Sequence, residues 1–247
     1  MLSNYHLFSG SPNHCSIRRM VATTITRPQS LTEEVHARLR ADLLACRLAP
    51  GSKLSINELC AAHGVSLAVV REALSRLSAE GLVVAEAQRG FRVPPIASRD
   101  LAHLTEARIE IECSCLTRSI ASGGLDWEAR VTSAYKRMAT LPERDPDDPA
   151  RLGDAYAAAH ARFHAELVSG CENPWFLKQR DMLFVQSERY RRLSEPLQNP
   201  VRDLEAEHRA LMHATLDRVV ERACSAMREH LSRTTKILLA SGLCDLS

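Results

Sequence analysis

Residues 55–82 read SINELCAAHGVSLAVVREALSRLSAEGL, and their pattern indicates the fold of the first half of the chain. Ser55 and Glu58 have the spacing of a capping box, in which each side chain bonds an unpaired amide of the first helical turn. Gly64 suits the left-handed residue that ends a helix, and Ser66 is placed to cap a further helix two residues later. Because two short helices joined by a tight turn with a glycine are typical of it, we predict a helix-turn-helix here.

The residues on either side extend this motif. Apolar residues recur every four positions over 31–43, which indicates one face of an amphipathic helix. Two apolar runs, 82–84 and 91–93, flank a turn that contains Gly90 and predict a β-hairpin. Three helices followed by a hairpin predict a winged helix-turn-helix domain over residues 31–95.

The chain after Pro94 and Pro95 is predicted to be helical throughout. Its breaks are glycines, prolines and an acidic stretch, and they leave six helical segments, at 99–122, 126–139, 150–169, 174–194, 201–217 and 221–241. Helices with short connections are typical of a bundle, which we assign to residues 96–247. The sequence therefore predicts a mainly α protein, a winged helix-turn-helix followed by an all-helical bundle. Residues 1–30 show no periodicity, and we predict a disordered tail there.

Composition excludes several classes of protein. Of the 247 residues, 45% are hydrophobic and 25% charged, which is ordinary for a globular chain that buries a core. No apolar stretch approaches the roughly 20 residues of a membrane span, and the first twenty residues lack the pattern of a secretory signal. We therefore expect a cytoplasmic protein with no membrane partner. The eight cysteines are scattered without a CxxC and are expected to be reduced.

Four histidines fall on three of the predicted bundle helices. His160 and His164 are four residues apart, so they lie on one face of a helix and can hold one metal ion. His208 and His230 lie in amphipathic stretches of two other helices. Four converging imidazoles would suit zinc or nickel. With ten histidines in the chain, one such pair also arises by chance, so spacing alone leaves ordinary core histidines as an alternative.

Both halves of the chain resemble one known family. The first half resembles the DNA-binding domain of GntR-family transcription regulators, on Pro50, Gly51, Leu54, Glu58, Leu59, Gly64–Ser66, Val70–Leu74, Leu77, Glu80–Leu82, Arg89 and Gly90. The second half is similar to the FCD effector-binding domain of the FadR-like subfamily, on Arg108, Glu112, Phe163, His164, Ser169, Gly170, Asn173, Glu207, His208, Ala223, Met227 and His230. The resemblance covers residues 31–241 in the expected order.

The resemblance implies a set of DNA-contacting residues. The helix that begins at Ser66 would place its N-terminal residues against base edges, where Arg71 reaches a guanine or a phosphate. Arg89 is similar to the family's minor-groove contact from the wing, with Gly90 permitting close approach. Leu67 stands where most relatives carry an arginine, so the family's usual operator is not expected. The predicted contacts are Asn57, Ser66, Leu67, Ala68, Arg71, Arg89 and Gly90.

The resemblance also implies a metal and an effector. Relatives bind a divalent metal through histidines at these places, although most carry an aspartate where this chain has His160. The predicted ligands of a zinc or nickel ion are His160, His164, His208 and His230. By spacing alone, Arg108 and Glu112 form an ion pair on a solvated helix face. The resemblance instead places Arg108 in a cavity, where its guanidinium would clamp the carboxylate of a small organic acid.

Together these features predict a repressor that binds double-stranded DNA and is released by an organic acid. We expect a homodimer on a palindromic operator, because dimers of this motif contact two half-sites. Two alternatives remain open: a winged-helix protein-interaction module without a specific operator, and a metal-dependent hydrolase. Catalytic zinc keeps an open position and a general base nearby. The sequence has no HExxH, and Glu166 is expected to point away from the metal face.

Overall fold

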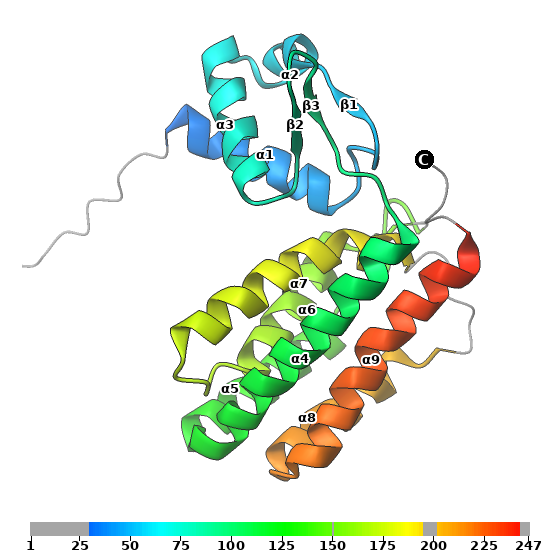
Figure 1. Ribbon diagram of the computed structural model, residues 1–247. Helices are drawn as coiled ribbons and strands as arrows, with labels where there is room; N and C mark the ends of the chain where they lie inside the picture. The colour runs from blue at the N-terminus through cyan, green and yellow to red at the C-terminus, as the bar shows by residue number, and fades with distance from the viewer. Residues whose placement is uncertain (1–29, 150, 195–201, 243–247) are drawn as a thin grey trace, which may run out of the picture.

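The computed structural model describes residues 30–149, 151–194 and 202–242, so all of the predicted tail except Ser30 lies outside the described residues. Figure 1 shows a small winged unit seated at one end of a helical bundle. Among the described residues, every helix falls short of the length or the hydropathy that a membrane span requires.

The first unit is the predicted winged helix-turn-helix. It contains, in order, α1 (Leu31–Leu44), β1 (Lys53–Leu54), α2 (Ile56–His63), α3 (Leu67–Ala79), β2 (Val84–Glu86) and β3 (Gly90–Arg92). The strands form an antiparallel sheet in the order β1-β3-β2. The predicted hairpin is therefore present, but β1 was not predicted, because two residues are too short to show an alternating pattern.

The helix caps differ in part from the prediction. At the start of α2, Ser55 Oγ accepts a hydrogen bond from the Glu58 amide at 3.4 Å, and the reciprocal bond of a capping box is not formed. A complete capping box lies instead at the start of α1, between Ser30 and Glu33. Ser66 occupies the N-cap position of α3 without a side-chain bond. Gly64 ends α2 at φ 64°, as predicted.

The second unit contains the six predicted helices within the described residues. They are α4 (Ser98–Ser122), α5 (Leu125–Ala139), α6 (Asp154–Leu167), α7 (Pro174–Ser194), α8 (Leu204–Leu216) and α9 (Val220–Ser241). The long helix α4 packs against both α7 and α9, while α5 packs on α6 and α8 on α9 (Figure 1). Gly170 permits a close approach after α6, because a Cβ atom there would lie 2.9 Å from the Ser119 carbonyl oxygen of α4.

The two units meet along α7. Val185 packs against the core of the winged unit. The Gln186 side chain donates a 2.6 Å hydrogen bond to the Glu80 carbonyl at the end of α3, and Arg189 donates to the Pro94 carbonyl at 3.3 Å. The winged unit is therefore held against α7 as well as joined to α4 through the chain.

Candidate nucleic-acid interface and metal centre

Helix α3 has one buried and one exposed face. Its buried residues are Val70, Ala73, Leu74 and Leu77, which pack in the core of the winged unit. On the other face Leu67 is 46% exposed, and Ala68 and Arg71 are also exposed. Arg76 pairs with Glu72, whereas Arg71 has no ion-pair partner among the described residues. The Arg71 guanidinium is therefore free to meet an external acceptor.

The other predicted DNA contacts lie on the same unit. Asn57 on α2, Ser66 before α3 and Arg89 near the tip of the hairpin are all exposed. Gly90 adopts φ 93°, a conformation that favours glycine and turns the chain tightly at the wing. The structure thus exposes these side chains around α3 and the wing, and Arg71 and Arg89 supply positive charge there.

The four predicted metal ligands converge in the interior of the bundle. His160 and His164 come from α6, His208 from α8 and His230 from α9. All are buried, with 0–6% of their surface exposed, and one ring nitrogen from each lies within 4.8 Å of the others. In a tetrahedral site with metal–nitrogen bonds of about 2.1 Å, the ligating nitrogens lie about 3.4 Å apart. Small side-chain rotations would therefore bring these four atoms onto one ion.

The chemistry of the cluster also fits a metal. Both ring nitrogens of His164 and of His208 are buried without a hydrogen-bond partner in the described structure, as is Nδ1 of His160. Buried polar atoms are almost always satisfied, so such a group of orphaned nitrogens calls for an unseen partner. A divalent ion would satisfy several of them at once. Within the described residues, this is the only such cluster of three or more candidate metal ligands.

Electrostatics keep these imidazoles in the metal-binding form. Burial lowers the pKa of His160, His164 and His208 well below the ordinary value, and repulsion from neighbouring histidines and arginines adds to it. The pKa of His230 is also lowered by burial, although a hydrogen bond to Glu207 opposes this shift. Neutral imidazole is the species that coordinates metals.

Glu207 orients one of the four rings. His230 Nδ1 lies 2.9 Å from Glu207 Oε2 and donates to it when it carries the proton, which leaves Nε2 as the acceptor nitrogen. Arg202 and Arg233 also bond this carboxylate. Although burial opposes it, the hydrogen bonds from His230 and Arg202 hold the pKa of Glu207 well below its usual range. A carboxylate behind a ligating histidine is a common means of fixing the tautomer.

Arg108 and Glu112 are buried, so the alternative of an ion pair on a solvated face is wrong. The Arg108 guanidinium lies 3.4 Å from Glu112 Oε1 and donates to Ser187 Oγ at 2.6 Å. Arg180 on α7 bonds the same carboxylate oxygen at 3.1 Å. Burial lowers the pKa of Arg108 to about 10, which leaves it charged at neutral pH. The pair belongs to the interior because the packing of α7 covers that face of α4.

A small cavity of about 30 Å³ is lined by Arg108 and by two of the four histidines. Its lining includes Thr105, Arg108, His160, Ser187, Arg191 and His230. Sequence reasoning missed Arg180, Ser187 and Arg191, all on α7. Residues 180, 187 and 191 are polar and share a helical face with Phe184, so the sequence did contain a pattern that marks them. That pattern could not be interpreted before the packing of α7 was known.

Glu166 is not available as a general base. Its carboxylate receives hydrogen bonds from Arg130 at 3.2 Å and from Ser169 at 2.9 Å, and it is not part of the histidine cluster. This agrees with the expected direction of its side chain.

Comparison with known proteins gives a consistent result over both units. Residues 31–93 match the family model described as bacterial regulatory proteins, gntR family, and residues 103–233 match the model of the FCD domain. An uncharacterized HTH-type transcriptional regulator, BphR of Paraburkholderia xenovorans, is 40% identical over 219 residues, 89% of each chain. The HTH-type transcriptional repressor GlaR of Escherichia coli is 31% identical, over 78% of this chain and 89% of its own.

A solved structure shares the fold. Escherichia coli McbR/YncC superposes with a TM-score of 0.70 at 21% identity, covering 86% of this chain and 99% of its own.

Proposed function

Because this chain belongs to the GntR family of bacterial regulatory proteins and carries an FCD domain, it is a DNA-binding transcription regulator and not an enzyme, and we propose that it is a repressor released by a small organic acid. The proposal that an organic acid binds as effector rests on the convergence of four buried histidines beside the buried guanidinium of Arg108. GlaR is named a transcriptional repressor, which supports repression rather than activation.

We assign the operator contacts to the exposed residues of α2, α3 and the wing. Arg71 would donate to a guanine edge or a phosphate in the major groove, and Leu67 would offer an apolar contact to a thymine methyl group. Arg89 would enter the adjacent minor groove. The full set is Asn57, Ser66, Leu67, Ala68, Arg71, Arg89 and Gly90. One winged unit makes few base contacts, so we propose a homodimer that binds the two halves of a palindromic operator.

We assign the metal to His160, His164, His208 and His230, and the effector to Arg108 with Glu112. Four neutral imidazoles favour zinc or nickel over magnesium or calcium, which prefer oxygen ligands. The ion would supply positive charge that attracts a carboxylate. Arg108 would orient that carboxylate from the opposite side, while Ser187 and Arg191 on α7 line the same cavity.

Helix α7 offers a direct route from the effector to the DNA-binding unit. Ser187 touches Arg108, and the preceding residues Val185 and Gln186 touch the winged unit. A shift of α7 on effector binding would therefore move the end of α3, in addition to any tilt of α4 passed through Pro94 and Pro95. The spacing of two reading helices must match a helical repeat of about 34 Å, so small shifts favour one arrangement of the dimer over another.

Replacing Gln186 tests this route. Gln186→Ala removes the 2.6 Å bond to the Glu80 carbonyl without touching the cavity. We expect operator affinity and carboxylate affinity each to stay within about threefold of wild type, while the effector-induced loss of operator affinity falls by about tenfold, a coupling change of about 1.4 kcal/mol. Fluorescence anisotropy with labelled operator, with and without effector, measures the operator affinity and its loss on effector binding. A coupling equal to that of wild type would show that the Gln186 bond does not transmit the effector signal.

Salt dependence distinguishes the regulator from a protein-interaction module. Binding sites recovered from genomic fragments with the purified protein should be inverted repeats. Affinity for them should fall steeply with salt, because phosphate contacts release counterions. A winged helix that only contacts proteins would show neither the repeats nor the slope.

A further inference from the structure

A cleft lies between the two units, away from the histidine cluster. It has a volume of about 430 Å³ and is bounded by α1 of the winged unit and by α6 and α7 of the bundle. Small-molecule sites typically occupy about 300–1,000 Å³ and are frequent at domain interfaces. Among the described residues, its lining shares no member with that of the small cavity beside Arg108. This interdomain cleft is therefore a separate space of ligand size.

The walls of the interdomain cleft are apolar and made of small side chains. They include Ala37, Ala41 and Leu44 from α1, Ala158 and Ala161 from α6, and Phe184 from α7. The alanines of α1 and α6 have small side chains, which leave the space between these two helices unfilled. An apolar body of a ligand would replace water there and gain the usual hydrophobic free energy.

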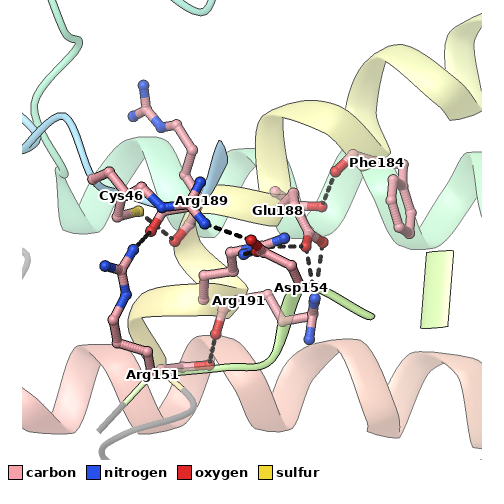
Figure 2. A network of polar contacts seen from close by, with 12 residues as sticks. Cys46, Arg151, Asp154, Phe184, Glu188, Arg189 and Arg191 are labelled. Carbon is pink, nitrogen blue, oxygen red and sulfur yellow. Dashed lines mark hydrogen bonds and ion pairs between the residues drawn. The ribbon is translucent and has the colours of Figure 1, made fainter. Parts of the chain in front are cut away.

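At the polar end of the interdomain cleft, the carboxylates of Asp154 and Glu188 already accept hydrogen bonds, whereas some arginine nitrogens have no acceptor. Asp154 is bonded by Arg47 and by Arg192, the latter at 2.6 Å, and Glu188 is bonded by Arg192 at 3.2 Å and by Arg191. Figure 2 shows Asp154 and Glu188 within this network of arginines.

Arg40 differs from Arg192, the other arginine that lines this cleft. Its Nε donates a hydrogen bond to Glu80 at 3.0 Å, and its two terminal nitrogens have no partner among the described residues. The unused hydrogen-bond donors of the cleft thus belong to a cation, the Arg40 guanidinium. It matches an anionic group of a ligand.

We propose that the interdomain cleft binds a second organic acid, one with an apolar body, whose carboxylate meets Arg40 while the body lies between the alanines of α1 and α6. Such an occupant would contact both units at once, so it would favour one arrangement of the DNA-binding unit over another. Phe184 also lies beside the first site, with the Arg108 guanidinium 4.8 Å from its ring centre. Phe184 therefore contacts both the interdomain cleft and Arg108, and any coupling between the two sites is reciprocal.

The test uses the full chain and 2-naphthoate, a fluorescent aromatic carboxylate, in the presence of a chelator so that no bound metal contributes. We expect saturable binding of one molecule per chain. 2-Naphthalenemethanol, which has the same body without the carboxylate, should bind at least tenfold more weakly. Ala158→Trp fills the cleft from an exposed position, and Arg40→Met removes the cation but keeps the stem. Each should weaken 2-naphthoate at least tenfold.

Arg38→Met is the matched control, because Arg38 lies on the same helix, is exposed and pairs with Glu34 outside the cleft. It should bind 2-naphthoate as wild type does, and so should His208→Ala. Absence of saturable binding, or a loss in His208→Ala equal to that in Ala158→Trp, would overturn the proposal. If circular dichroism shows that Ala158→Trp does not fold, Arg40→Met decides, and unchanged affinity refutes the site. Operator affinity without the probe is measured separately, so failure here leaves the proposed repressor function standing.

Discussion

Arg71→Ala is expected to lower operator affinity by at least about 30-fold while leaving the fold intact. The side chain is exposed on α3 and has no ion-pair partner among the described residues, so its loss leaves no buried charge behind. A bidentate arginine–guanine contact contributes about 1–3 kcal/mol, and a dimer loses it at both half-sites, about 2–6 kcal/mol in all. Since each 1.4 kcal/mol is tenfold, the expected loss runs from about 30-fold to about 10⁴-fold.

Arg38→Ala is the control for Arg71→Ala. It removes the same charge from the same unit, at an exposed site on α1 where Arg38 pairs with Glu34 at 2.5 Å. We expect a change of about twofold or less, because exposed ion pairs contribute little. Fluorescence anisotropy at a fixed salt concentration compares the variants. If Arg71→Ala binds the operator as tightly as wild type does, α3 is not the recognition helix.

The double replacement of His208 and His230 by alanine is expected to abolish metal binding and the response to effector, while operator binding stays within about threefold of wild type. It removes two of four converging imidazoles, which lie in the bundle and not on the exposed face of α3. In wild type, a metal at about 1,000 times its Kd stabilises the fold by about 4 kcal/mol. For a chain of this size, chelation should therefore lower the Tm by about 10 °C. The double variant should show no such shift.

His213→Ala is the matched control for that experiment. His213 lies on α8 five residues after His208 and is exposed, so its loss removes an imidazole without touching the cluster. Metal content by atomic emission and Tm with and without chelator should equal those of wild type. If the double variant is still released from operator by the same carboxylate as wild type, the histidines have a structural role and the metal-bridged mechanism is wrong.

Much of the first unit and the course of the second were predictable from local pattern. The periodic apolar residues of α1 and α3, the left-handed Gly64 and the glycine of the hairpin all act through neighbours within a few residues. The same holds for the shared face of His160 and His164, because a helical turn fixes it. Even here the capping box lay at Ser30 rather than Ser55, since caps depend on side-chain geometry that spacing alone does not set.

The order of the helices and strands, and the family that the residues resemble, could therefore be inferred from the sequence. The packing of the helices determines that His208 and His230 meet the α6 pair, that Arg108 is buried beside Arg180, and that α7 touches both the cavity beside Arg108 and the winged unit. Local structure follows from interactions between near neighbours in the chain. The site depends instead on which faces of helices far apart in sequence pack together, and that choice is made by burial of the whole core.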